Sequence, residues 1–363
     1  MNNALSNPLW QPSARQVSET NLAKFTKGLK LPNDYTILHA WSVDYKDLFW
    51  RAVWKHCKIV GDIGSDRVLI NENKLLESTF FPDATLNFAE NLLHNRGNQL
   101  AIISHLENGE QHRLTRNQLL EQVHALSSQF KNFNLEMGDR VAAFMPNTHE
   151  TVTTMLAATT LGGTFTSCSP DFGANGVVDR FSQTSPKILV ATSGYTYNGN
   201  FISSLPTIIE VCEQVPSIEH LILVTSLDNG TTTRNTDIEN LLAQLTCQVH
   251  YYAELIATQA VGPLEFTRVP FNHPLYIMYS SGTTGTPKCI VHGTGGTLIQ
   301  HLKEHQLHVD VKPGDRLFYF TTCGWMMWNW LVSGLASGAT LILYDGSPTF
   351  PEPQRLWDLI DSE

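Results

Sequence analysis

Residues 277–288 read Ile-Met-Tyr-Ser-Ser-Gly-Thr-Thr-Gly-Thr-Pro-Lys, an apolar, strand-like start that breaks into small polar residues and ends in a lysine. Glycines let backbone N–H groups approach an anion closely, hydroxyl side chains add donors, and a lysine adds positive charge. The pattern therefore predicts a phosphate-binding loop, rather than a plain polar surface turn, with contacts from Ser280, Ser281, Gly282, Thr283, Thr284, Gly285, Thr286 and Lys288. It is not a Walker A loop, because Pro287 precedes the lysine and Cys289 follows it, where that motif needs Gly and then Ser or Thr.

Length and composition favour a globular enzyme of more than one subdomain. The chain has 363 residues, of which 42% are hydrophobic, enough for a large core and more than one usual domain. Its net charge of -10 argues against nucleic acid and anionic membranes as partners, because neither polyanion attracts an acidic protein over long range. Small-molecule substrates fit better. The composition predicts no oligomeric state.

The cysteines and the N-terminus favour a cytoplasmic location. Six cysteines are scattered without a CxxC pair, which fits neither a disulfide framework nor a zinc knuckle and is typical of reduced thiols. The first ten residues contain no basic region followed by an apolar one, so they carry no secretion signal.

Hydrophobic periodicity divides the chain into two parts. Residues 1–97 read as a mostly helical, Trp-rich cap, and from residue 98 strand and helix patterns alternate to the end. A strand at 100–105 and a helix at 116–133 begin this alternation, which indicates a layered α/β sheet.

The α/β part contains a weak internal duplication. Gly-Asp-Arg opens a strand at residue 138 and again at residue 314, and each copy continues through a helical stretch and a Gly turn into a second strand that ends at Ser-Pro. Two strand, helix, strand units predict two related α/β subdomains. The second copy includes residues 317–344, whose lack of charge admits a membrane span. Its polar and glycine interruptions, and the shared plan of the two copies, favour the α/β unit.

Histidines near the loop have two readings each. His301, His305 and His308 share one face of an expected helix, but no acid or cysteine completes a metal site, so we predict a solvated helix face and no metal ligand. His292 lies where a strand should turn towards a helix N-terminus, so it either helps to bind an anion or is structural.

A cluster of aromatic residues and methionines follows at residues 320–330. Core packing is the default explanation for such a cluster. The segment leaves a strand end, however, where open α/β sheets bind ligands. We therefore favour a substrate pocket lined by Trp325, Met326, Met327 and Trp328, with core packing as the alternative.

The loop sequence resembles, position by position, the signature of the adenylate-forming enzymes, the superfamily of acyl-CoA synthetases, luciferases and peptide-synthetase adenylation domains. Residues 7–13, Asn-Pro-Leu-Trp-Gln-Pro-Ser, and the Trp-rich cap resemble the branch with acetyl-CoA and acetoacetyl-CoA synthetases. Acetyl-CoA synthetases usually have Gly-Trp-Val-Thr-Gly-His where residues 324–329 read Gly-Trp-Met-Met-Trp-Asn, so the likeness is greater to acetoacetyl-CoA synthetases.

The resemblance implies a two-step ligation with ATP, Mg²⁺ and CoA. A carboxylate attacks the α-phosphate of ATP to give an acyl-adenylate and diphosphate, and the CoA thiol then displaces AMP. Acetoacetate is the expected acid, acetate and propionate are alternatives, and a non-catalytic nucleotide-binding protein is the alternative of another class.

The resemblance also implies motifs that this chain lacks. Related enzymes continue with an adenine and Mg²⁺ motif, a ribose-binding Asp and a mobile C-terminal domain with the catalytic Lys. None is present, so we expect an N-terminal fragment, with residues 98–363 an incomplete AMP-binding domain, that is inactive by itself. Arginines that related enzymes place on the CoA nucleotide are absent near residues 193–200, so no CoA-binding residue is predicted.

Overall fold

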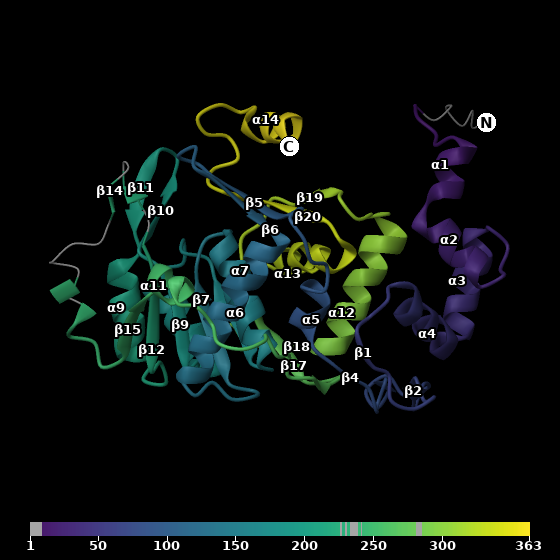
Figure 1. The fold of residues 1–363 in the computed structure, drawn as a ribbon, viewed down its shortest axis with the longest axis horizontal. Helices are drawn as coiled ribbons and strands as arrows, with labels where there is room; N and C mark the ends of the chain where they lie inside the picture. Colours follow the sequence, from purple (N-terminus) through teal and green to yellow (C-terminus); the bar gives the residue numbers. More distant parts are fainter. Residues whose placement is uncertain (1–8, 226, 229–230, 233–238, 241, 281–284) are drawn as a thin grey trace.

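The computed structural model describes residues 9–225, 227–228, 231–232, 239–240, 242–280 and 285–363. Two β-sheets, with helices between and around them, form most of the molecule, and the first helices extend from one end (Figure 1). This mixed α/β architecture confirms the predicted fold class.

The larger sheet has seven strands. In spatial order these are β15 (Gln248–Tyr251), β12 (His220–Val224), β9 (Ile188–Thr192), β7 (Arg140–Phe144), β8 (Thr164–Cys168), β17 (Pro274–Ser280) and β18 (Lys288–Gly293). Neighbouring strands are parallel except β17 and β18, which are antiparallel. Strands β7 and β9 are almost entirely buried and apolar, as expected of parallel strands with helices on both faces.

The smaller sheet has four strands. They are β19 (Arg316–Phe318), β20 (Thr340–Asp345), β5 (Leu100–Leu106) and β6 (Gln111–Thr115), with only the last pair antiparallel. Short strands form the remaining pairings: β1 (Gly61–Asp62), β4 (Thr85–Leu86) and β16 (Val269–Pro270) together, β2 (Leu69–Ile70) with β3 (Thr79–Phe80), β10 (Gly194–Tyr197) with β11 (Asn200–Ser203), and β13 (Leu227–Asp228) with β14 (Thr231–Thr232).

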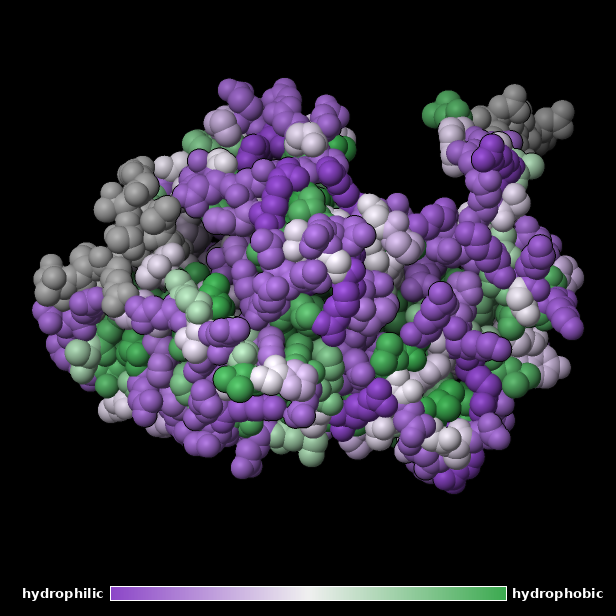
Figure 2. Space-filling model, in the orientation of Figure 1, coloured by the Kyte–Doolittle hydropathy of each residue, from purple (hydrophilic) through white to green (hydrophobic). Residues whose placement is uncertain are grey.

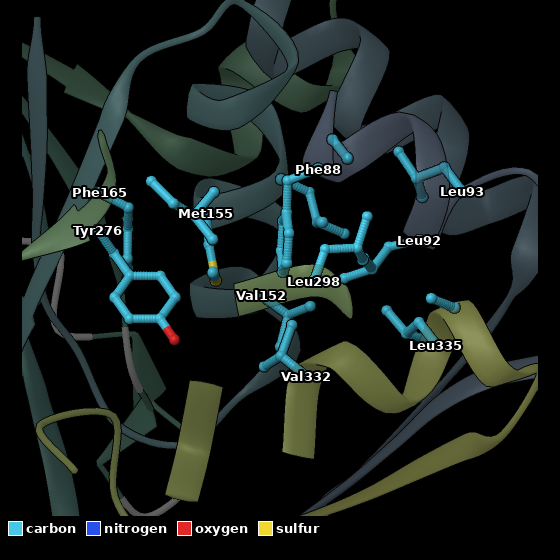
Figure 3. Packing of buried hydrophobic residues seen from close by; sticks show 14 of the residues in the cluster. Phe88, Leu92, Leu93, Val152, Met155, Phe165, Tyr276, Leu298, Val332 and Leu335 are labelled. Carbon is cyan, nitrogen blue, oxygen red and sulfur yellow. The ribbon is translucent and has the colours of Figure 1, made fainter. Parts of the chain in front are cut away.

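A helical layer lies between the two sheets and shares one core with both. Its members are α5 (Phe88–Leu92), α6 (Arg116–Asn132), α7 (His149–Thr160), α12 (Thr294–Lys303), a π-helical turn η1 (Glu304–His308), α13 (Met326–Ser333) and a 3-10 turn η2 (Gly334–Ser337). Figure 3 shows Met155 of α7 beside Phe165 and Tyr276 of the larger sheet, with Val332 and Leu335 of the second unit below. The longest of these helices, α6, begins at a capping box in which the Thr115 and Gln118 side chains satisfy each other's backbone N–H groups.

Other helices cover the outer faces. The outer face of the larger sheet packs against α8 (Ala174–Thr184) and α9 (Leu205–Gln214), because alternate residues of β7, β9 and β12 point away from the shared core. Helix α11 (Tyr252–Ala257) lies beside α6, and α14 (Arg355–Ser362) packs Leu359 on the smaller sheet.

The predicted duplication is present in the backbone hydrogen bonds. In each unit the N–H of the first glycine donates to the carbonyl of a glycine before the second strand, and the N–H that opens the second strand donates back to the aspartate after the first glycine. The bonds are Gly138 to Gly162 (3.0 Å) and Thr164 to Asp139 (2.8 Å), and in the second copy Gly314 to Gly338 (3.0 Å) and Thr340 to Asp315 (2.8 Å). One copy contributes β7 and β8 to the larger sheet, and the other contributes β19 and β20 to the smaller.

The N-terminal helices are α1 (Ala14–Glu19), α2 (Asn21–Gly28), α3 (Tyr35–Asp44) and α4 (Lys46–His56). Of these, α2 packs beside η1 and α4 beside α12, and polar and aromatic contacts to neighbouring segments hold them there. Asn21 donates its backbone N–H to Asp310 Oδ1 (2.6 Å) and its amide to the Val311 carbonyl (3.0 Å). Trp54 of α4 stacks on Phe271 at 6.5 Å between ring centroids. Helix α5 belongs to the shared core although it precedes residue 97.

In the part of the chain that the structure describes, no helix is long and apolar enough to cross a membrane. The uncharged residues 317–344 form β19, α13, η2 and β20 instead, as the duplication predicted. On the face drawn in Figure 2, hydrophobic residues occur in small separate groups among hydrophilic ones.

Candidate active site

The predicted phosphate-binding loop connects β17 to β18 at the edge of the larger sheet. Ser280 ends β17 and Lys288 begins β18, and the two residues are directly opposite in the antiparallel register. Gly285 has a φ of 130°, a backbone conformation that favours glycine, and Thr286 and Lys288 are exposed. The Gln183 side chain of α8 fixes this arm by donating to the Pro287 carbonyl (3.0 Å). Four predicted contacts, Ser281, Gly282, Thr283 and Thr284, lie outside the described residues.

A single face of β17 leads from the loop into the core. Because side chains alternate along a strand, Ser280, Met278 and Tyr276 point to the same side. Their partners on β18 are Lys288, Ile290 and His292 in the same order. The face is thus polar and charged at the loop, apolar in the middle and aromatic at the buried end.

His292 belongs to the buried end of this face. Its ring lies 4.9 Å from the Tyr276 ring, and its Nδ1 atom is buried without a hydrogen-bond partner. Burial lowers the pKa of His292, which favours a neutral imidazole. Both readings of this residue, structural and anion-binding, therefore stay open.

A narrow pocket lies against the middle of this face, and in this structure it has no room for a water molecule. Residues of β8, β17 and the segment before and within α13 surround it: Phe165, Thr166, Ser167, Tyr276, Ile277, Met278, Cys323, Gly324 and Asn329.

Some side chains of residues 325–328 are exposed and one is in the core. Trp325 and Met326 are exposed, at 69% and 45% of their areas, and Met327 is half-buried. Trp328 is fully buried and stacks near Phe165 with 6.0 Å between ring centroids. Core packing thus accounts for Trp328 in this structure, while contact of the other three with a substrate stays a prediction.

Asn147, which sequence reasoning missed, connects this segment to both sheets. Its Oδ1 atom accepts the Trp328 indole N–H (2.9 Å), and its Nδ2 donates to the carbonyls of Thr321 (3.3 Å) and Tyr344 (3.4 Å). The side chain is 2% exposed and follows the end of β7. An asparagine soon after an apolar strand was the sequence signal, but its partners are distant in the chain.

Asp345, also missed, lines a second pocket where strand ends of the two sheets meet. This pocket is bordered by carboxylates and hydroxyls, among them Glu107, Glu110, Glu150, Thr148, Tyr195 and Asp345. The Asp345 carboxylate accepts one long hydrogen bond, from the Asn147 backbone N–H (3.4 Å). Burial raises the pKa of Asp345 to about 7, and the charges of Glu107 and Asp171 add to the rise. Perturbed carboxylates in clefts are candidates for functional residues.

The prediction that His301, His305 and His308 form a solvated face is wrong for the first two. His301 is 6% exposed and bonds the Ser333 hydroxyl through Nδ1 (2.8 Å), and His305 is fully buried with its ring 4.4 Å from that of Trp330. The reason is that α13 and η2 pack against this side of α12 and η1. Burial lowers the pKa of His301 to about 3 and of His305 to about 4, so both are neutral.

Among the described residues, no three or more His, Cys, Asp or Glu side chains lie together in a way that could hold a metal ion. The six cysteines are free, and five of them are buried.

Known proteins are similar to this chain in sequence, and a solved structure is similar to it in fold. Acetoacetyl-coenzyme A synthetase of Rhizobium meliloti (strain 1021) is 44% identical over 98% of this chain and 54% of its own length. Acetoacetyl-CoA synthetase of Gallus gallus is 38% identical over 98% and 54%. The solved acetoacetyl-CoA synthetase from Streptomyces lividans superposes with a TM-score of 0.86 at 36% identity, over 96% of this chain and 53% of that one.

The chain therefore spans about half the length of the relatives that it matches. The family model described as AMP-binding enzyme matches residues 89–363, which include both sheets, the loop and the pocket beside it. This chain belongs to the AMP-binding enzyme family.

Proposed function

We propose that the complete protein is an AMP-forming acid–thiol ligase that converts ATP, acetoacetate and CoA into acetoacetyl-CoA, AMP and diphosphate. The observation that carries the proposal is the likeness to proteins named acetoacetyl-CoA synthetase over 98% of this chain. Because this chain spans only about half the length of those relatives, the activity of the whole protein is a proposal. ATP, acetoacetate and CoA are then its small-molecule substrates, and the cytoplasm is the expected location.

The loop between β17 and β18 is the proposed site for the ATP phosphates. Backbone N–H groups and hydroxyls of residues 280–286 would hold the phosphate oxygens, and Lys288 would offset the charge that develops on the leaving diphosphate. The opposed positions of Ser280 and Lys288 support this role. An oxygen of the acid's carboxylate attacks the α-phosphorus, the bond to the diphosphate breaks, and the acyl-adenylate forms.

The acid is proposed to bind between the inner face of β17 and the start of α13. Trp325, Met326 and Met327 would form the outer wall, and Trp328 would support that wall from the core. In the second step the CoA sulfur attacks the acyl carbon and AMP leaves. Mg²⁺ would arrive with ATP, since the described residues contain no cluster that could hold it. We also propose that residues 1–97 form a cap and that residues 98–363 form the AMP-binding unit. Helix α5, although it precedes residue 97, packs in the core of the AMP-binding unit.

The test is diphosphate release by the full-length protein with ATP, Mg²⁺ and a panel of acids: acetoacetate, acetate, propionate and butyrate. We expect the highest kcat/KM with acetoacetate, and acetoacetyl-CoA as product when CoA is added. A preference for acetate or propionate would refute the choice of acid. ATP binding without diphosphate release from any acid would instead support a non-catalytic nucleotide-binding protein.

A further inference from the structure

A third pocket, of about 420 Å³, lies between the N-terminal helices and the turn that follows α12. Helices α2, α3 and α4 form one side of it, and the end of α12 together with η1 forms the other. We call it the cap pocket. Its size falls in the range of small-molecule sites, which span about 300–1,000 Å³.

The walls of the cap pocket are apolar. Phe25, Leu38 and Leu307 are at most 6% exposed, and Leu22 and Phe49 are half-buried. The Phe25 and Phe49 rings pack edge to face with 6.1 Å between their centroids. Such walls favour a ligand with an apolar body, because contact removes apolar surface of both the ligand and the protein from water.

Basic side chains border the same pocket. His39, Lys303 and His308 line it, and none of its lining residues, all of which the structure describes, is an Asp or a Glu. The turn after α12 is π-helical, with a hydrogen bond from the Val309 N–H to the Glu304 carbonyl (2.9 Å), and such a turn brings residues five apart to the same side. Lys303 and His308 are five apart. Burial, and then the Lys303 charge, lower the pKa of His308, in agreement with this placement.

The positive charge of Lys303 is not balanced by a carboxylate in the part of the chain that the structure describes. Its Nζ atom lies 5.9 Å from the centroid of the Trp50 ring. The acid next to it, Glu304, instead accepts hydrogen bonds from the Gln300 amide (2.7 Å) and the Trp330 indole (3.0 Å). A cation beside an apolar pocket attracts an anion more strongly than one in open water does, because the pocket lowers the local dielectric constant.

We propose that the cap pocket binds a medium-chain fatty acid, with its alkyl chain between the apolar walls and its carboxylate at Lys303. One lysine balances one negative charge, so a monocarboxylate fits better than a doubly charged alkyl phosphate. The site goes beyond the proposed function, because none of its lining residues belongs to the phosphate loop or to the proposed acid site. A ligand there contacts both the N-terminal helices and α12, which lies in the segment that the family model matches.

The test is isothermal titration calorimetry of the full-length protein, without ATP, with butyrate, hexanoate and octanoate. Each buried methylene strengthens binding about fourfold. We therefore expect octanoate to bind at least about 30-fold more tightly than butyrate. Equal affinities for the three acids, or no binding of octanoate at about 5 mM, would overturn the proposal.

Octanol tests the role of charge, because it has an alkyl chain of similar length and no charge. Lys303→Gln removes the cation and keeps a good helix former. It should weaken octanoate binding about three- to tenfold and leave octanol binding within about twofold. The control is Lys27→Gln, since Lys27 is exposed in the last turn of α2 and does not line the pocket. Equal weakening of octanoate binding by the two substitutions would assign the effect to general surface charge and refute the role of Lys303.

A substitution in the apolar wall tests where the alkyl chain binds. Leu22→Gln should weaken octanoate and octanol binding alike, by about three- to tenfold, with the fold checked by circular dichroism. If octanoate binds the wild-type protein but neither Lys303→Gln nor Leu22→Gln weakens it, the acid binds elsewhere and the proposal is wrong. Diphosphate release with acetoacetate tests the proposed function separately, so that either proposal can fail alone.

Discussion

Asp345 allows a direct test of whether a buried carboxylate destabilises the fold where the two sheets meet. It ends β20, next to the second pocket, and its carboxylate accepts a single hydrogen bond, at 3.4 Å from the Asn147 N–H. Glu107, nearby, accepts much shorter bonds from the N–H groups of Gly199 (2.7 Å) and Ser347 (2.6 Å). The negative charge of Asp345 is therefore poorly stabilised, and we predict that Asp345→Asn stabilises the protein above neutral pH.

The magnitude follows from the pKa. The value rises from 3.8 to about 7 in the folded state, and each unit corresponds to about 1.4 kcal/mol. Between these values the folded chain holds a proton that the unfolded chain has lost, so stability falls as pH rises from about 4 to about 7 and stays low above. The full shift corresponds to about 4 kcal/mol, and partial exposure of the side chain reduces this to about 2–4 kcal/mol.

The assay is thermal unfolding of wild type and Asp345→Asn at pH 5 and pH 8. At pH 8 the midpoint should rise by about 3–5 °C, since unfolding entropy for a chain of this length is about 0.8 kcal/mol per degree. At pH 5 the unfolded carboxyl has lost its proton but only about the first third of the fall in stability has occurred, so the difference should be about a third of that at pH 8. The control is Asp179→Asn, an exposed carboxylate on α8, which should change little at either pH. Equal stabilisation at both pH values, or destabilisation at pH 8, would refute the reasoning.

Three further substitutions test other parts of the structure. Asn87 is fully buried, accepts the Glu90 N–H at the start of α5 and donates to three backbone carbonyls. Asn87→Ala should therefore lower the free energy of unfolding, measured by denaturant titration, by about 3–4 kcal/mol. A loss under about 1 kcal/mol would contradict the role of this hydrogen-bond network. Tyr276→Phe removes a buried hydroxyl without a partner, so the same titration should show stability unchanged or raised by up to about 1 kcal/mol. In the full-length enzyme, Thr284→Val should keep the fold by circular dichroism but slow diphosphate release about tenfold, and unchanged kinetics would make the loop structural.

Much of the fold could be predicted from the sequence, because turn residues and hydrophobic periodicity are local features. Gly-Asp-Arg at residues 138 and 314 makes the same turn twice, and the apolar runs after each copy have the length and composition of buried strands. The phosphate-binding role of residues 280–288 stays a prediction from residue type, since small, hydroxylated and glycine residues suit a phosphate cradle. These features need no knowledge of distant contacts.

Sequence reasoning failed where the burial of a side chain depends on segments that are distant in the chain. Spacing places His301 and His305 on one helix face, but whether α13 or water covers that face depends on contacts about 30 residues away. The burial of Trp328 depends on distant contacts as well, because the Asn147 amide oxygen that accepts its indole N–H is 181 residues away.

The sequence by itself determined the α/β class and the repeated unit, because turn residues and hydrophobic periodicity act over a few residues. Only the tertiary structure brought Asp345 to Asn147 and Asn329 to Met278. The members of each pair are distant in the chain. Their contacts form only when the two sheets close on one core.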